Sequence, residues 1–125
     1  MQTVGAFAVI FDSDASVLLC HRTDRDAWNP PGGRVEPGET PQEAVVREVL
    51  EEVGLRVRVE RLLGVHPVPA KDDLVFTFVC VPVGGVLSTS SEADQVAWFA
   101  RANLPANTLP RHVERIEEAY EGRPR

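Results

Sequence analysis

The sequence has few of the residues that build cross-linked or membrane-embedded proteins. It holds only two cysteines, Cys20 and Cys80, which excludes a disulfide framework and a zinc-binding cysteine pattern. Each lies inside an apolar stretch, so both are expected to be buried, reduced thiols. No apolar run approaches the ~18 residues of a membrane span, and no basic-then-apolar leader opens the chain. We therefore expect a cytoplasmic protein that does not associate with membranes.

Positive charge is also scarce. Lysine and arginine together number 13 against 19 acidic residues, which gives a formal net charge of −6. A nucleic-acid polymer is a poor partner for such a chain, because binding its backbone needs clustered cations. A small phosphorylated molecule is compatible with this charge if a metal ion supplies the local positive charge.

The length and the pattern of apolar residues predict a single domain, residues 1–125, of the α/β class. Strands are predicted at Thr3–Phe11, Val17–His21, Arg34–Glu36, Leu55–Val65, Leu74–Val81 and Gln95–Phe99, and helices at Thr40–Val53 and Arg111–Tyr120. The first two strands are expected to pair as a hairpin. Pro67 and Pro69 should restrict the Leu55–Val65 strand to a sheet edge or end it. This order indicates a mixed sheet covered by helices on its faces.

The helix at Thr40–Val53 has the clearest boundary signals. Thr40 is a good N-cap residue, Pro41 suits the first helical position, and Glu43 completes a capping box. Gly54 supplies a left-handed stop.

The same helix carries a cluster of carboxylates. At 3.6 residues per turn, Glu48, Glu51 and Glu52 share one side, opposite an apolar stripe of Val45, Val46, Val49, Leu50 and Val53. Mg²⁺ favours such oxygen clusters and pairs them with substrate phosphates. The alternative is a solvated acidic face without a ligand. The glycine-rich loop before the helix favours a metal site, because its backbone can come close to a bound ion or phosphate.

The spacing across this loop and helix resembles the Nudix box. Every specified position matches: Gly33, five residues, Glu39, seven residues, and then the run from Arg47 through Glu48, Glu51, Glu52 and Gly54 to Leu55. With typical residue frequencies, such a match should arise by chance about once in 10⁹ windows. The resemblance covers residues 33–55. It implies a Nudix-type α/β/α sandwich and an enzyme that hydrolyses a nucleoside diphosphate linked to another group, X.

The resemblance also implies a role for each matching residue. The metal ligands and catalytic carboxylates would be Glu48, Glu51 and Glu52, with the carbonyl group of Gly33 as a further ligand. Arg47 would pair with a neighbouring carboxylate, and Glu39 would brace the loop against the helix. The implied cofactor is Mg²⁺ or Mn²⁺, since both accept octahedral oxygen ligands. The family resemblance leaves a homodimer open.

Two residues outside the box resemble positions of MutT-like family members. Glu92 stands six residues before Trp98, where such members place a metal-binding or base glutamate. Asn107 lies in a Pro-Ala-Asn context typical of a purine-reading asparagine, and its amide suits a base edge. The alternatives are a charged loop residue for Glu92 and, for Asn107 or Thr108, a cap on the last helix.

Three further side chains are candidates for substrate binding. Trp28, just before Pro30, is either a stacking platform for a base or a plug at the end of the sheet. Arg22 and Arg34 flank the same region and are candidates for contacts with phosphates.

These features rank three functions. The first is a MutT-like nucleoside triphosphate pyrophosphatase that releases a nucleoside monophosphate and pyrophosphate. The second is an ADP-ribose or dinucleotide pyrophosphatase, for which a proline such as Pro69 is a weak indication. The third, a non-catalytic nucleotide-binding module, is disfavoured because no glutamate of the box is missing.

Overall fold

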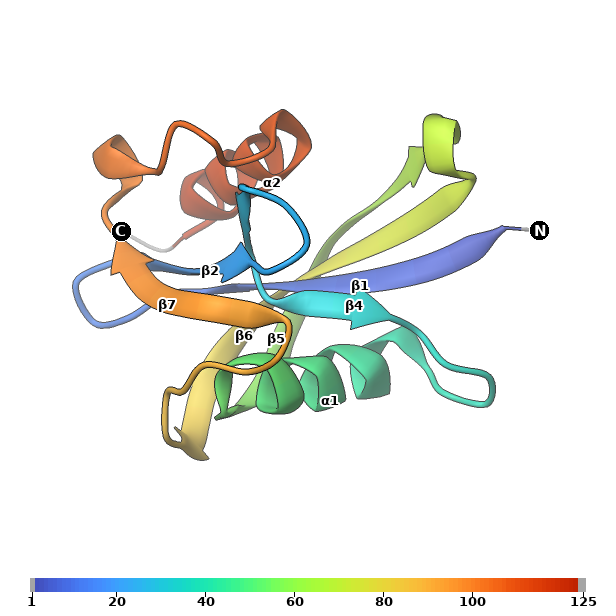
Figure 1. Ribbon diagram of the computed structural model, residues 1–125, viewed down its shortest axis with the longest axis horizontal. Coiled ribbons are helices and arrows are strands. Elements are labelled where there is room, and N and C mark those ends of the chain that lie inside the picture. The colour runs from blue at the N-terminus through green and yellow to red at the C-terminus, as the bar shows by residue number, and fades with distance from the viewer. Residues whose placement is uncertain (1, 124–125) are drawn as a thin grey trace.

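The computed structural model describes residues 2–123, which form two β-sheets and two long helices (Figure 1). The strands are β1 Thr3–Ile10, β2 Val17–Arg22, β3 Trp28–Asn29, β4 Gly32–Arg34, β5 Leu55–Val68, β6 Asp73–Gly85 and β7 Ala93–Phe99. The helices are α1 Pro41–Val53 and α2 Pro110–Glu121, with short 3-10 turns η1 Pro69–Lys71 and η2 Arg101–Asn103. No helix among the described residues is long and apolar enough to cross a membrane.

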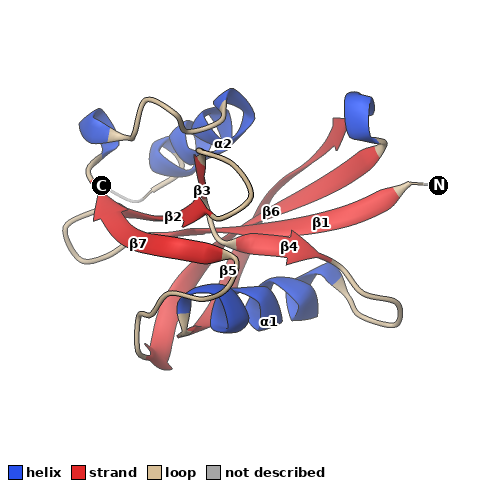
Figure 2. Ribbon diagram, viewed as in Figure 1, coloured by secondary structure: helices blue, strands red, loops and turns tan. Residues whose placement is uncertain are grey.

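The larger sheet is mixed, as predicted. Its strand order is β4-β1-β6-β5, in which only β1 and β6 are parallel. The smaller sheet, β3-β2-β7, is antiparallel. Helix α1 lies on one side of the sheets and α2 on the other (Figure 2). This arrangement confirms the predicted α/β/α sandwich.

Strand β1 separates the two cores because its side chains alternate between its faces. Ala6, Ala8 and Ile10 pack in the core beneath α1, whereas Val9 packs in the core beneath α2. Both faces of β1 are therefore buried, as is usual for a strand with a parallel partner.

The predicted hairpin of the first two strands is wrong. Beyond an isolated bridge between Phe11 and Val17, β1 and β2 diverge into different sheets. The reason is that β1 has two apolar faces and takes a central position, pairing along its whole length with β6.

Strand β5 occupies a sheet edge, as predicted, but it continues past Pro67 to Val68. An edge strand tolerates proline because one side of its backbone needs no partner. The predicted strand at Arg34–Glu36 lies two residues earlier, at Gly32–Arg34.

Helix α1 has the predicted caps. The Thr40 side chain accepts a hydrogen bond from the Glu43 N–H, and the Glu43 side chain accepts one from the Thr40 N–H. Gly54 ends the helix with φ of 80°, in the left-handed region.

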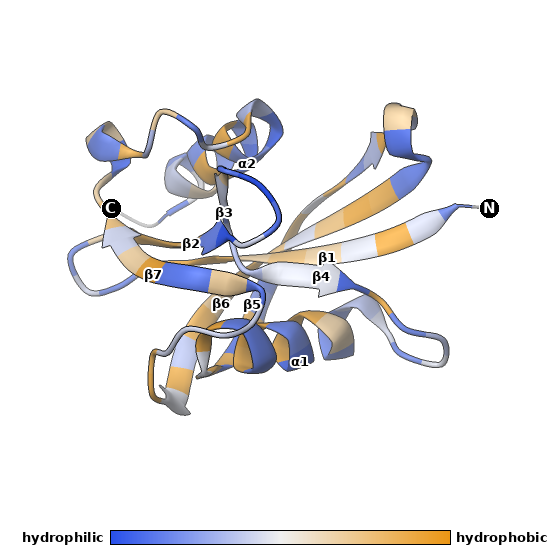
Figure 3. Cartoon of the chain, viewed as in Figure 1, coloured by the Kyte–Doolittle hydropathy of each residue, from blue (hydrophilic) through white to orange (hydrophobic). Residues whose placement is uncertain are grey.

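The predicted buried stripe of α1 is partly wrong. Val46 and Leu50 are 36% and 39% exposed, whereas Glu52 is only 7% exposed. The face that packs on the sheet is therefore centred nearer Glu52, so that Ala44, Val45, Val49 and Val53 are buried beside it. Figure 3 shows hydrophilic and hydrophobic bands that alternate along this helix.

Candidate metal and nucleotide site

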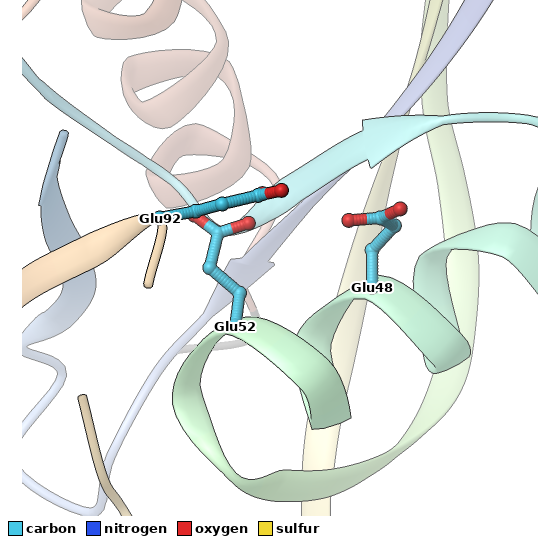
Figure 4. Close-up of side chains that lie close together, drawn as sticks. All are labelled: Glu48, Glu52 and Glu92. Carbon is cyan, nitrogen blue, oxygen red and sulfur yellow. The ribbon is translucent and has the colours of Figure 1, made fainter. Parts of the chain in front are cut away.

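Three carboxylates meet beside β4. Glu48 and Glu52 project from successive turns of α1, and Glu92 reaches over them from the residue just before β7 (Figure 4). One oxygen from each side chain lies within 4.8 Å of the others. We call these three residues the carboxylate group.

Glu52 is the most buried member of the carboxylate group. Its Oε1 accepts a hydrogen bond from the buried Cys20 thiol at 2.8 Å, and its Oε2 accepts one from the Gly32 N–H at 3.4 Å. Burial raises the pKa of Glu52 to about 7, and the charges of Glu92 and Glu48 raise it further. Keeping this side chain ionised at neutral pH therefore requires a positive charge nearby.

Glu48 lies against the backbone of β4. A Cβ atom on Gly33 would overlap the Glu48 carboxylate, so only glycine allows this close approach. Burial raises the pKa of Glu48, while its hydrogen bond from Arg47 lowers it.

Arg47 links the helix to the preceding loop. Its Nε and Nη2 donate to the two oxygens of Glu39 at 2.7 and 2.9 Å, and Nη2 also donates to the Arg34 carbonyl. Its Nη1 donates to Glu48 at 2.8 Å and to Glu51 at 3.2 Å. Arg47 lowers the pKa of Glu39 to about 2, chiefly through these hydrogen bonds. The bracing expected of Glu39 and Arg47 is present in the structure.

Glu51 lies apart from the carboxylate group. Its side chain is 61% exposed and contacts Arg47. The structure thus brings Glu92 beside Glu48 and Glu52, whereas the helical spacing had predicted Glu51 there.

The carboxylate group borders a cleft of about 560 Å³. The other residues that line this first cleft are Phe7, Arg22, Thr23, Asp24, Asn29, Gly32, Gly33 and Arg34. Arg22 and Arg34 therefore lie where they were expected, although Arg22 is paired with Asp24 at 2.5 Å.

Sequence reasoning missed two lining residues, Phe7 and Asn29. Asn29 is 5% exposed, and its side-chain oxygen is buried without a hydrogen-bond partner. A lone asparagine or phenylalanine in an apolar segment gives no signal that it faces a cleft.

Trp28 and Asn107 do not line the first cleft. Trp28 packs edge-on against His21 and Phe99, which makes it a plug of the sheet rather than a stacking platform. Asn107 donates its amide N–H to Asp26 at 2.9 Å. The alternative role as a helix cap is wrong for both Asn107 and Thr108, because α2 begins after Leu109 without a side-chain cap.

The donor set suits a hard divalent cation. Carboxylate oxygens are the ligands that Mg²⁺ prefers, and two of the three here are desolvated beside like charges. A cation among them would offset both the desolvation and the repulsion.

Comparisons with known proteins place this geometry in context. The family model described as the NUDIX domain matches residues 1–121. A "MutT-like protein" of Streptomyces ambofaciens is 34% identical over 122 residues, which cover 98% of this chain and 79% of that protein. An "ADP-ribose pyrophosphatase" of Methanocaldococcus jannaschii is 38% identical over 103 residues, 77% of this chain and 61% of that protein. A solved NUDIX hydrolase from Nitrosomonas europaea superposes with a TM-score of 0.83 at 30% identity, covering 98% of this chain and 90% of that one.

Proposed function

The chain belongs to the Nudix family of hydrolases, and from this premise we propose that it is a divalent-metal-dependent nucleoside triphosphate pyrophosphatase. It would hydrolyse the triphosphate to a nucleoside monophosphate and pyrophosphate. The proposal rests on one observation above all, the three carboxylates within 4.8 Å of one another at the border of the first cleft. The MutT-like relative supports the choice of a triphosphate.

Each residue of the site has a proposed task. Glu48, Glu52 and Glu92 would hold the cation, with the Gly33 carbonyl as a further ligand. The cation, which we propose is Mg²⁺, neutralises phosphate charge and lowers the pKa of bound water. Arg47 positions Glu48 through their 2.8 Å contact and keeps Glu51 beside it.

Hydrolysis also needs a proton acceptor and contacts to the phosphates. A carboxylate that is not consumed by the metal, Glu51 or the exposed Glu92, would take the proton from the attacking water. Arg22 and Arg34 line the first cleft and would contact the phosphates. In-line attack on phosphorus then requires mainly positioning and charge stabilisation.

The test is a product-resolved screen of nucleoside triphosphates with purified protein, Mg²⁺ or Mn²⁺, and an EDTA control. We expect monophosphate and pyrophosphate in equal amounts with at least one triphosphate, and no product in EDTA. Release of single phosphates, or no cleavage of any canonical or oxidised triphosphate, would overturn the assignment.

ADP-ribose is the second candidate substrate. The M. jannaschii relative carries this activity in its name, and the site chemistry is the same for any diphosphate. Including ADP-ribose in the same screen separates the two. Faster cleavage of ADP-ribose than of every triphosphate would favour this second candidate.

A further inference from the structure

A second cleft, of about 340 Å³, lies between α2 and the ends of β5 and β6. Figure 1 shows this region above the sheet, between the N-terminal part of α2 and the extended β5–β6 pair. Its apolar walls are Pro67, Val68, Pro69 and Val75. Its polar residues are His66, Thr77, Arg111, His112, Glu114 and Arg115, none of which borders the first cleft.

Three buried nitrogens in this second cleft lack hydrogen-bond partners. They are His66 Nδ1, Arg111 Nε and His112 Nε2, and His112 as a whole is only 3% exposed. Among the described residues, only one other buried side-chain polar atom, in Asn29, is in this condition. A buried polar group without a partner costs about 1–3 kcal/mol. Three in one cleft therefore point to a ligand that accepts hydrogen bonds.

The charges around the second cleft favour an anion. Arg111 forms no salt bridge with any described residue, and burial lowers its pKa. By contrast, Arg115 is paired with Glu118 at 2.5 Å and with Glu114 at 3.2 Å, so these charges offset one another. Lys71 adds further positive charge near His112.

The backbone adds to this preference. Arg111 and His112 lie in the first turn of α2, which has no side-chain cap. The N-terminus of a helix carries partial positive charge and favours anions. This backbone field and the unpaired guanidinium of Arg111 come together in the same cleft.

We propose that the second cleft binds an oxyanion, a phosphate or a carboxylate, through Arg111, His66 and the first turn of α2. The position suggests where such a group comes from. Phe7 lines the first cleft and packs on His112 with ring centroids 4.9 Å apart, so this ring pair separates the two clefts. A substrate with its diphosphate at the carboxylate group can therefore place an acidic end of its group X in the second cleft. This last step rests on the proposed function.

Inorganic phosphate tests the site without any turnover. Calorimetric titration of phosphate in EDTA should show saturable binding to the wild-type protein, weakened at least tenfold in Arg111→Gln. Arg58→Gln is the matched control, because Arg58 is exposed on β5 and lines neither cleft. His66→Asn, with a melting curve for each variant, covers the case in which Arg111→Gln fails to fold. Absence of binding, or equal binding by the wild type and both cleft variants, would overturn the proposal.

A kinetic comparison identifies the source of the anion. Two nucleotide substrates are used that differ only in a terminal phosphate on the group X. If the anion belongs to the substrate, Arg111→Gln raises KM at least tenfold for the phosphorylated substrate alone and leaves kcat unchanged. If both substrates respond equally while phosphate titration still depends on Arg111, the site binds a free anion. Failure of all hydrolysis would contradict the proposed function but not the phosphate site.

Discussion

Among single residues, Glu52 carries opposing demands of stability and chemistry. Its burial raises its pKa from the ordinary value of 4.5 to about 7. The folded state therefore holds a proton that the unfolded state loses, and this contribution to stability is full below pH ~4.5 and lost as pH rises through 7. At pH 8 the ionised side chain destabilises the metal-free protein.

Glu52→Gln should accordingly stabilise the metal-free protein at pH 8, by up to ~3 kcal/mol. The gain should vanish at pH 4, where Glu52 is protonated in both states, and hydrolytic activity should be lost. Urea unfolding in EDTA at the two pH values measures this. A variant that is less stable than the wild type at pH 8 would show that burial does not strain the carboxylate.

Gly33 is a second residue whose role follows from one contact. In Gly33→Ala, the new methyl group would overlap the Glu48 carboxylate and displace it from the carboxylate group. We expect activity to fall at least tenfold, a loss of ~1.4 kcal/mol of transition-state stabilisation or more.

Gly5→Ala is the control for this change. Gly5 lies on the neighbouring β1, where a Cβ would meet nothing closer than 3.6 Å. Steady-state kinetics and melting curves of both variants separate the site from the sheet. Equal activity of the two alanine variants would mean that Glu48 does not need its position against β4.

At the scale of elements, α1 does two tasks with one face. Its caps were predictable because they depend on residues within one turn, Thr40 with Glu43 at the start and Gly54 at the end. The orientation of the buried face was not. Glu52 turns toward the sheet because Cys20 and Gly32 supply hydrogen bonds to it, and neither contact is local in the sequence.

The junction of α1 with the loop before it depends on the planar guanidinium of Arg47. Arg47→Lys keeps the charge but cannot donate to both oxygens of Glu39, Glu48 and the Arg34 carbonyl at once. We expect lower kcat and faster amide hydrogen exchange at Glu36, whose N–H donates to Glu39. Arg58→Lys on exposed β5 is the control. Unchanged exchange at Glu36 together with wild-type kcat would contradict the bracing role.

At the scale of the whole molecule, the site is assembled from segments far apart in the chain. Glu92 was predictable only from its distance to Trp98, and the fold brings it beside α1. Trp28 and Asn107 show the limit of such reasoning, since whether they face a substrate depends on how β2, β7 and the loop before α2 pack together. The hairpin prediction failed for the same reason, because long-range pairing of β1 with β6 prevailed over its neighbour in sequence.

The central claim is that the carboxylate group performs metal-dependent hydrolysis of a nucleotide diphosphate linkage. Glu48 tests it best, because it belongs to the box, to the carboxylate group and to the Arg47 network. The decisive measurement is the rate of product formation from the best nucleotide substrate, in Mg²⁺ and in EDTA, by the wild type and by Glu48→Gln. Glu60→Gln, an exposed carboxylate on β5, serves as the control. We predict Mg²⁺-dependent hydrolysis by the wild type and the control, and a loss well beyond tenfold in Glu48→Gln with little change in melting temperature. Hydrolysis that persists in EDTA, or a Glu48→Gln variant within tenfold of the wild type, would contradict the claim.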